Sequence, residues 1–585
     1  TSKNMEKFND FLVTLDSYLS GSWWFPALLI GTGIFFTIYL GFPQFKYFKS
    51  SWKIVSGKYE KSASDGETTP FQALTTAMSG AVGTGNIGGV ALAIWIGGPA
   101  AIFWMWITAV FGMTTKFVEV TLAHKYRTKL ADGSTSGGPM YYIEKGLNLK
   151  WVAILFSILM MLTAIGSGNM PQINNIALAM DSNFSVPKAA TGLVLGALLW
   201  IIIIGGISRI ASVASKIIPI MGIVYFGGAL IILIENYQNI IPSFNSIFTQ
   251  VFTGSAAVGG FLGASFAASL KYGVARGLYS NEAGQGSSPI AHASSKTEKS
   301  VDQGVVSILE PFIDTIVVCS VTALVILSSG VWTQKFDTNF SYTDTEIISG
   351  QFNDEVNEDG TYLYPDQMKD LIMYMSNSST TVKRYTGSIN VVNGIPQPNN
   401  FTILHSRSIA EDVFVSEFIE EDKKSVWDTI KSFFISSSNV NNELTGFSGV
   451  LEVENGKILK DNNFIIKGKS LVHSAELTAH AFSQGVLGEW GGKLVAIALL
   501  LFAFSTAIAW CYYGDRSTAY VFGEKGVIWY RNIYVLCFIL AAVIDTTVVW
   551  NIAYVVVALV SIPNLIAIFV LRKEMKQLSD EFVTK

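Results

Sequence analysis

Charged residues are scarce in this chain. Only 14% of its 585 residues are Asp, Glu, Lys or Arg, whereas about a quarter is usual for a soluble globular domain. The formal net charge of −4 is too small to indicate a nucleic-acid partner. The three cysteines all lie in apolar stretches, which argues against a disulfide framework. The composition therefore predicts a protein whose main environment is the lipid bilayer.

Long apolar runs make up most of what is present. A bilayer core of about 30 Å needs around 20 apolar residues per helix. The segments that meet this requirement are 23–43, 72–95, 99–123, 151–180, 188–207, 214–235, 255–279, 303–331, 493–515, 528–546 and 548–571. Together they predict an all-α polytopic membrane protein with eleven transmembrane helices.

The basic residues in the short loops predict the orientation, because Lys and Arg stay in the cytoplasm. The loops after the first and third spans are rich in Lys, and Lys271 and Arg276 fall at the end of the seventh span. All of these lie on one face if the N-terminus is outside and the C-terminus is cytoplasmic. We expect a multi-pass protein of the plasma membrane, which is the inner membrane in a Gram-negative cell.

One polar region interrupts the spans and is predicted to lie outside. Within it, "VLEVENGKIL" alternates and turns on Asn455-Gly456, as a β-hairpin does. The stretch "IAEDVFVSEFIEEDKKSVWDTIKSFF" has the pattern of an amphipathic helix. We therefore expect an inserted extracellular α+β domain, whose partner is unknown. The predicted organisation is an extracellular segment 1–22, spans one to eight in 23–332, the insert 333–480, spans nine to eleven in 481–572, and a cytoplasmic tail 573–585.

The second span is unusually rich in glycine. Its stretch "TAMSGAVGTGNIGGVALAIW" combines Ser79, Thr84 and Asn86 with several glycines. Glycine pairs in membrane helices often serve only to let helices approach closely. A polar, glycine-rich centre has a second interpretation, since it can leave the helical ladder and expose main-chain groups to a cavity. Transporters build mid-membrane binding sites in this way.

The seventh span contains a second such run, with Gly259, Gly260 and Gly263. Five crossings separate the two glycine-rich helices, so they cross the bilayer in opposite directions. This is the geometry of a five-plus-five inverted repeat. The first span then remains as an extra, peripheral helix.

Several long motifs point to a family. The stretches "AMSGAVGTGNIGGVALAIWIGGPAAIFWMW", "SGGPMYYIEKGL", "ARGLYSNEAGQGSSPIAHA" and "FAFSTAIAWCYYGDRS" closely resemble the alanine or glycine:cation symporters, also called the sodium:alanine symporter family. The resemblance covers nearly all the spans. It implies a leucine-transporter-like fold and sodium-coupled uptake of small neutral amino acids such as alanine and glycine. The insert departs from the family pattern, so the resemblance implies nothing about its role.

A zwitterionic substrate needs partners for a carboxylate and an ammonium. The amides of Gly83, Thr84 and Gly85 would carry the positive end of a half-helix dipole and suit the carboxylate. Gln172 and Asn175 lie three residues apart on one helical face; buried amides often only join helices, but the resemblance favours a site-lining role. The predicted substrate-binding set is Ser79, Gly83, Thr84, Gly85, Gln172, Asn175, Phe261, Thr506 and Trp510.

Ser505 and Thr506 in the ninth span have two interpretations. Hydroxyls in membrane helices commonly bond back to their own carbonyls. The distant resemblance of "AVGTGN" and "GGPAAIFWMWITAVFGMTTKFVE" to neurotransmitter:sodium symporters instead implies a sodium site. The implied sodium ligands are Ser79, Val82, Phe502, Ser505 and Thr506. Trp510 and Phe261 are candidate walls that leave room only for a small side chain.

Acidic residues within the spans leave other functions open. Glu310 and Asp314, spaced i and i+4, could form a proton path, which makes proton coupling the rival mechanism; Glu119 could simply lie at the membrane interface. Glu282 and His292 lack the arrangement of a hydrolase and are interpreted as part of a gate loop. We expect no enzymatic activity. A ligand sensor or channel that uses the insert is the alternative from another class.

Overall fold

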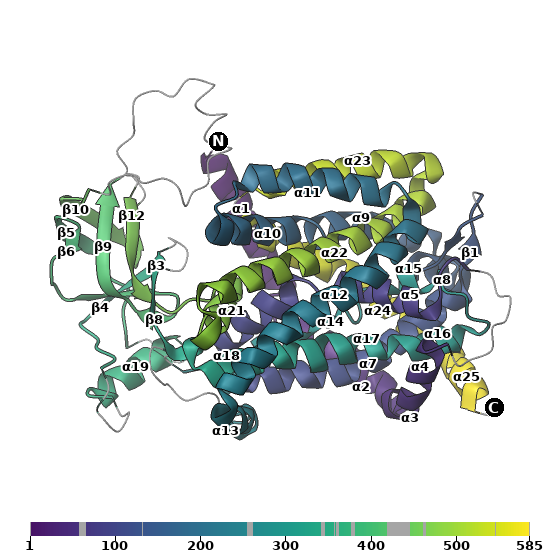
Figure 1. The fold of residues 1–585 in the computed structure, drawn as a ribbon, viewed down its shortest axis with the longest axis horizontal. Helices are drawn as coiled ribbons and strands as arrows, with labels where there is room; N and C mark the ends of the chain where they lie inside the picture. Colours follow the sequence, from purple (N-terminus) through teal and green to yellow (C-terminus); the bar gives the residue numbers. More distant parts are fainter. Residues whose placement is uncertain are drawn as a thin grey trace.

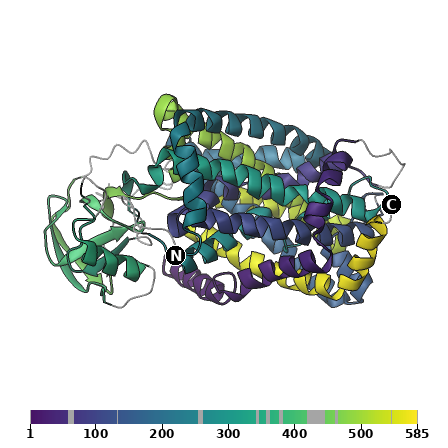
Figure 2. The ribbon, with the colours of Figure 1, turned by 90° about the horizontal axis from the view of Figure 1, so that it is seen from below.

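The protein is an elongated bundle of helices with a β-rich part at one end (Figure 1). The computed structural model describes residues 2–57, 66–131, 133–253, 261, 263–340, 345–355, 357, 362–375, 381–417, 445–459, 464–544 and 546–583. We call the end of the bundle that carries the β-rich part the insert end. The C-terminus lies at the opposite end, which we call the C-terminal end, and Figure 2 shows the same separation from a second side.

Six helical segments of the described chain are long and apolar enough to cross a membrane. They are Ala100–Lys125, Lys150–Phe184, Gly206–Glu235, Ser300–Ser329, Glu489–Phe522 and Thr546–Val570. The bent pair Pro70–Ala81 and Gly85–Gly97 is a seventh candidate, and Trp24–Tyr39 and Lys188–Ile203 are shorter apolar helices. The helices within 255–279 and 528–546 do not meet this test, so the count of eleven stays a prediction.

The helices of the bundle, and the shorter elements beside them and at its two ends, have the following bounds. The bundle contains α2 (Trp24–Tyr39), α5 (Pro70–Ala81), η1 (Gly85–Gly89), α6 (Val90–Gly97), α7 (Ala100–Lys125), α9 (Lys150–Gly166), α10 (Met170–Phe184), α11 (Lys188–Ile203), α12 (Gly206–Glu235), α14 (Phe266–Asn281), α15 (Ser288–His292), α16 (Ser300–Ser307), α17 (Leu309–Pro311), η2 (Phe312–Cys319), α18 (Ser320–Ser329), α22 (Glu489–Phe522), α23 (Glu524–Ala541) and α24 (Thr546–Val570). Shorter elements are α1 (Ser2–Tyr18), α3 (Pro43–Lys46), α4 (Phe48–Val55), β1 (Thr128–Lys129), β2 (Thr135–Ser136), α8 (Pro139–Leu147), α13 (Tyr237–Thr249), η3 (Val331–Thr333), α21 (Ser474–Phe482), η5 (Gly485–Leu487) and α25 (Arg572–Val583).

The glycine-rich second span is interrupted where the sequence predicts. Helix α5 begins with a capping box, in which Thr69 and Gln72 satisfy each other's backbone N–H groups. It ends at Ala81, because Val82 is extended, with φ −77 and ψ 94. The chain resumes as the π-helix η1 and then α6, bent by 55° from α5. Single-turn π segments of this kind are frequent at functional sites.

The structure has an interruption about twenty residues beyond the predicted one, and the predicted break itself stays a prediction. Gly259 and Gly260 are outside the described residues, and Gly263, with φ 88, precedes α14. Helix α14 runs unbroken to Asn281 and is followed by an irregular stretch in which Glu282 has φ 56 and Gly284 has φ 91. The short helix α15 continues the chain.

This shift also changes the placement of two basic residues. Lys271 and Arg276 line one cavity together with Asp16, which belongs to the segment predicted to lie outside. Because they share one cavity, Asp16 cannot lie outside while Lys271 and Arg276 lie on the cytoplasmic side, so these two predictions contradict each other. The physical reason is that 266–281 forms the part of this helix before its break, whereas the sequence suggested the part after it.

The β-rich part consists of three sheets formed by residues 336–470. The strands are β3 (Phe336–Asn339), β4 (Thr345–Ser349), β5 (Gly387–Val392), β6 (Ile395–Pro396), β7 (Phe401–His405), β8 (Ser408–Ile409), β9 (Glu411–Glu417), β10 (Gly449–Glu454), β11 (Lys457–Ile458) and β12 (Phe464–Ser470), and α19 (Pro365–Met375) packs beside them. The sheet orders are β11-β10-β5-β6, β3-β12-β9 and β4-β7-β8. Ile347, Ile389 and Val415 are among the residues of the apolar core that joins these sheets.

Two local predictions for this part have different outcomes. The hairpin at Asn455-Gly456 is confirmed, since β10 pairs with β11 in the register Val453↔Ile458 and both turn residues have positive φ. The amphipathic helix over 409–434 is wrong for its first part, because Glu411–Glu417 is strand β9. Alternating apolar residues there pair with β12, and this tertiary pairing overrides the helical pattern. The rest of that stretch lies outside the described residues.

Candidate functional site

A small cavity lies where the two interruptions face each other. Its volume is about 20 Å³, roughly the space that a single water molecule needs. The lining residues are Gly80, Ala81, Gly83, Thr84, Gly85, Ser167, Gln172, Tyr279, Glu282, Gln285, Thr506 and Trp510. A ligand larger than water would therefore bind only if the lining residues move apart.

The structure brings most of the predicted substrate-binding residues to this cavity. Those that line it are Gly83, Thr84, Gly85, Gln172, Thr506 and Trp510. A side chain at Gly83 would not fit, because its Cβ would lie 2.6 Å from Thr506 Oγ1 and 3.1 Å from Gln172 Oε1. Glycine is needed at position 83 because Thr506 and Gln172 approach its backbone closely, and because glycine also favours the interruption of the helix.

Three predicted residues do not line the cavity. Ser79 directly precedes the lining residue Gly80, and its hydroxyl is buried without a hydrogen-bond partner among the described residues. Asn175 donates back to the Pro171 carbonyl at 2.8 Å. Phe261 packs against Trp332, with ring centroids 5.0 Å apart, in a separate apolar cluster. Phe261 precedes α14, whereas the cavity residues of this segment begin at Tyr279, near the other end of that helix.

Main-chain amides at the first interruption point to side-chain oxygens. Gly83 N donates to Asn86 Oδ1 at 2.9 Å, and Thr84 N donates to Gln172 Oε1 at 3.3 Å. A carboxylate offers the same kind of acceptor with a full negative charge, and such bonds are roughly twice as strong. The Thr84 amide is thus placed to bind a carboxylate that displaces Gln172 Oε1.

Neutral oxygens gather beside the same break. Thr506 Oγ1 donates to the carbonyls of Val82, at 3.2 Å, and Phe502, at 3.1 Å. Ser505 Oγ donates to the Phe502 carbonyl at 2.8 Å. These bonds include the back-bonding within α22 that the sequence left open, but the Val82 contact joins two helices. Hydroxyl and carbonyl oxygens are the ligands that hard cations prefer.

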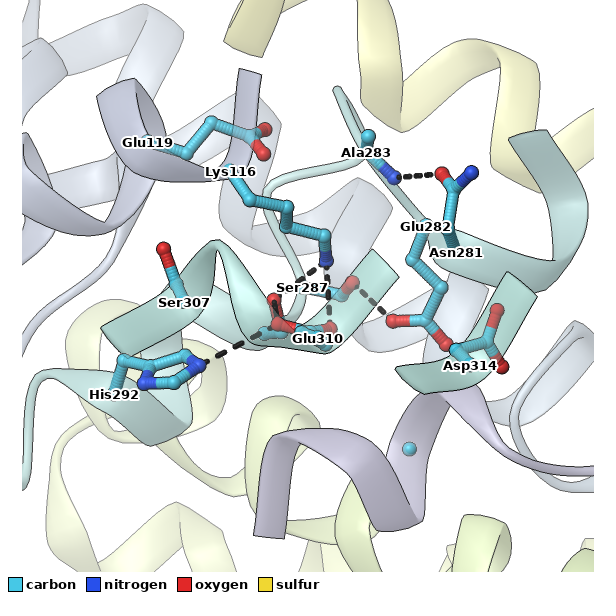
Figure 3. Close-up of polar contacts among 12 residues, drawn as sticks. Lys116, Glu119, Asn281, Glu282, Ala283, Ser287, His292, Ser307, Glu310 and Asp314 are labelled. Carbon is cyan, nitrogen blue, oxygen red and sulfur yellow. Dashed lines mark hydrogen bonds and ion pairs between the residues drawn. The ribbon is translucent and has the colours of Figure 1, made fainter. Parts of the chain in front are cut away.

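A fully buried ion pair lies next to the second interruption (Figure 3). Lys116 Nζ on α7 is 3.0 Å from Glu310 Oε1 and donates to Ser288 Oγ at 2.6 Å. His292 Nε2 is 3.4 Å from the other Glu310 oxygen. Figure 3 shows Lys116 and His292 converging on Glu310. Because a buried charge is costly unless paired, this cluster ties α15 to α7 and α17.

The other acids of the region bind different partners. Glu119 accepts hydrogen bonds from Gly284 N at 3.2 Å and Gly286 N at 3.1 Å, so it is buried and holds the second interruption. Glu119 is therefore not solvated, and its depth in the membrane stays a prediction. Asp314 accepts from Asn86 Nδ2 at 2.6 Å and Ser280 Oγ at 2.7 Å. Glu310 and Asp314 do not contact each other in these bonds, although they are four residues apart.

Comparison with known proteins identifies the family. The family model described as "Sodium:alanine symporter family" matches residues 5–409 and 459–585. The chain belongs to the sodium:alanine symporter family. The unmatched residues 410–458 lie within the predicted insert.

Several relatives of this sodium:alanine symporter family member have names that state a function. The sodium/alanine symporter AgcS of Methanococcus maripaludis is 33% identical over 568 residues, covering 96% of this chain and 95% of AgcS. The "Probable sodium/glutamine symporter GlnT" of Bacillus subtilis is 38% identical over 345 residues, 59% of this chain and 71% of GlnT. The amino-acid carrier protein AlsT of Bacillus subtilis is 39% identical over 324 residues, 55% of this chain and 68% of AlsT.

Reasoning from the sequence missed six cavity residues of this sodium:alanine symporter family member: Gly80, Ala81, Ser167, Tyr279, Glu282 and Gln285. Glu282 is the most informative, because its carboxylate accepts from Trp510 Nε1 at 3.1 Å and from Ser287 Oγ at 2.6 Å. The signal was present in "SNEAGQGSS", where two glycines follow an acid within an otherwise helical segment. That signal was interpreted as a gate loop instead of the second interruption.

Proposed function

We propose that this protein is a secondary active transporter that carries small neutral amino acids, such as alanine or glycine, together with sodium into the cell. In this proposal eleven transmembrane helices form two inverted five-helix repeats and a peripheral first helix. The insert end and the N-terminus are outside, and the C-terminal end is cytoplasmic. The cavity opens to each side in turn, which is alternating access.

The observation that carries the proposal is the pairing at the first interruption. The Thr84 amide faces Gln172 Oε1 on one side, and Thr506 bonds the freed Val82 carbonyl on the other. The first contact supports a carboxylate site and the second supports a sodium site, in which the ion would replace the hydroxyl protons as the partner of the carbonyls. Ser79, with its unpartnered buried hydroxyl, would complete the sodium ligands.

The substrate follows from the cavity's size and charge. A cavity of only about 20 Å³ favours a small side chain, and Trp510 would limit that side chain. The ammonium would lie near carbonyls freed at the two breaks. Alanine is supported by the name of the relative AgcS and glutamine by that of GlnT, so the choice between them is part of the test.

Counterflow in proteoliposomes tests this function. Vesicles preloaded with unlabelled alanine should accumulate labelled alanine transiently, and only when sodium is present. Replacing alanine by glutamine or leucine inside the vesicles measures the substrate range. A channel would pass sodium without alanine, and a sensor would move neither solute; either result would refute the proposal.

Proton coupling is a second candidate, favoured by the buried ionisable groups. Lys116, Glu310 and His292 lie in one cluster without exposure to solvent, and Glu119 and Asp314 are buried nearby. Groups of this kind are functional by default at membrane depth. Uptake driven by a proton gradient in sodium-free buffer would support this candidate over sodium coupling.

A further inference from the structure

The inserted residues reach the helical bundle through the turn between β7 and β8. Ser406 and Arg407 are the two residues of this turn, because His405 pairs with Ser408 on either side of them. Ser406 has φ 49 and Arg407 has φ 59, the left-handed pair of a type I′ turn. Such turns favour Asn-Gly or Gly-Gly. Strain in residues with a Cβ persists only where surrounding contacts impose it.

The contacts that impose it come from Trp95, in the last turn of α6. Trp95 Nε1 donates to the Ser406 carbonyl at 2.8 Å. The Arg407 guanidinium carbon is 6.0 Å from the centre of the Trp95 ring, and the His473 ring is 4.7 Å from it. Among the described residues, Arg407 has no carboxylate partner, so its charge is directed to the indole face.

A second path joins the insert to the cavity. Leu471 N, just after β12, donates to Ser408 Oγ at 3.0 Å, so the end of the insert is hydrogen-bonded to the strand that follows the turn. Helix α21 follows, and its Thr478 Oγ1 donates to the Ile87 carbonyl at 3.0 Å. Ile87 lies in η1, which begins at the cavity-lining Gly85. The half-helix from the cavity to the insert end is therefore held at both ends by the insert and α21.

We propose that the turn of Ser406 and Arg407 is a gate over the insert end of the transport pathway. It must leave Trp95 before α6 can move and open the cavity to that side. What passes through the pathway rests on the proposed function, whereas the gate concerns access alone. A domain that lay on the surface without affecting transport would not need a strained, positively charged turn against α6.

The double substitution Ser406→Asn with Arg407→Gly tests the gate and keeps a sequence that favours the hairpin turn. Asn-Gly is the favoured pair for a type I′ turn, so the hairpin should fold at least as well. The guanidinium over Trp95 is lost, whereas the main-chain carbonyl at position 406 can still accept from Trp95 Nε1, so the variant isolates the contact of the Arg407 charge with the ring. A reporter thiol at Ala264→Cys, in a chain without its three native cysteines, lies in the buried cluster that packs against Trp95.

The measurement is the rate at which a membrane-impermeant maleimide labels the reporter in nanodiscs. We expect about tenfold faster labelling in the double variant, the factor that corresponds to a loss of about 1.4 kcal/mol. Trp95→Phe, which keeps a ring but loses the bond to Ser406, should give a smaller increase. Arg384→Ala is the matched control, because Arg384 is an exposed insert residue paired with Glu346; it should leave the rate unchanged.

The outcomes separate the gate from the proposed function. Labelling needs neither sodium nor substrate, so faster labelling supports the gate even if counterflow shows no transport. Equal rates in the parent, the double variant and Trp95→Phe would overturn the gate even if the parent transports alanine. An equal increase in Arg384→Ala would also overturn it, since any disturbance of the insert would then expose the reporter.

Discussion

Replacement of Thr506 by Val removes one hydroxyl from the proposed sodium site and keeps the shape of the side chain. In the structure this hydroxyl bonds two carbonyls, those of Val82 and Phe502. Phe502 keeps a second partner in Ser505, but Val82 loses this one. An unsatisfied buried carbonyl costs about 1–3 kcal/mol, which is small enough for a protein of this size to remain folded.

The effect on sodium should be larger than the effect on folding. Hydrogen bonds to charged groups contribute about 1.5–3 kcal/mol each, and a direct oxygen–sodium contact should be at least comparable. Its loss corresponds to a weakening of sodium affinity by a factor of about 10–150. The assay is alanine uptake into proteoliposomes as a function of external sodium, with thermal unfolding measured in parallel.

Two further variants make the result decisive. Thr506→Ser keeps the hydroxyl and should retain most of the sodium affinity. Thr518→Val is the matched control on the same helix, because the buried Thr518 hydroxyl donates to the Gly514 carbonyl at 2.8 Å, far from the break. If Thr506→Val and Thr518→Val show the same sodium dependence as the parent, the assignment of Thr506 to the ion is refuted.

Three more substitutions test the surrounding structure. Lys116→Met should lower the free energy of unfolding by about 3–5 kcal/mol, because it leaves Glu310 buried without its partner. The double variant with Glu310→Leu should recover much of that loss. If thermal unfolding shows the same loss in the single and the double variant, the two charges do not compensate each other. Glu119→Gln turns one acceptor toward Gly284 or Gly286 into a donor and should cost about 1–3 kcal/mol, with reduced uptake; unchanged uptake and unfolding would show that Glu119 does not hold the break. Trp510→Ala should admit larger amino acids in competition assays, and an unchanged substrate range would contradict its role as a wall.

The break in the second span could be predicted from the sequence because its causes are local. Glycines at 83 and 85 beside Ser79 and Thr84 weaken the helix wherever the segment is placed. The hairpin at Asn455-Gly456 was predictable for the same reason, since both residues favour positive φ. Gln172, Thr506 and Trp510 could be named as site residues through the family resemblance.

The second break shows where such reasoning fails. Gly273 and Gly277 lie in α14 without interrupting it, and their role is to let α14 approach α7 closely. A Cβ added at Gly273 would lie 2.4 Å from the Ala101 carbonyl oxygen, and one added at Gly277 would lie 2.0 Å from Thr108 Oγ1. A glycine that packs and a glycine that breaks a helix look alike in sequence. The break at Glu282 depends on Glu119, which binds the amides of Gly284 and Gly286 from another helix.

The sequence by itself determined the membrane class, the family and the first interruption, because composition, motifs and local backbone preferences need no long-range contact. Only the tertiary structure decided which acids are partners. Lys116 and Glu310 are 194 residues apart in the chain, as are Asn86 and Ser280, and no local pattern links them. Burial selects these pairs, since a charge or amide removed from water must find its partner on whichever helix packs beside it.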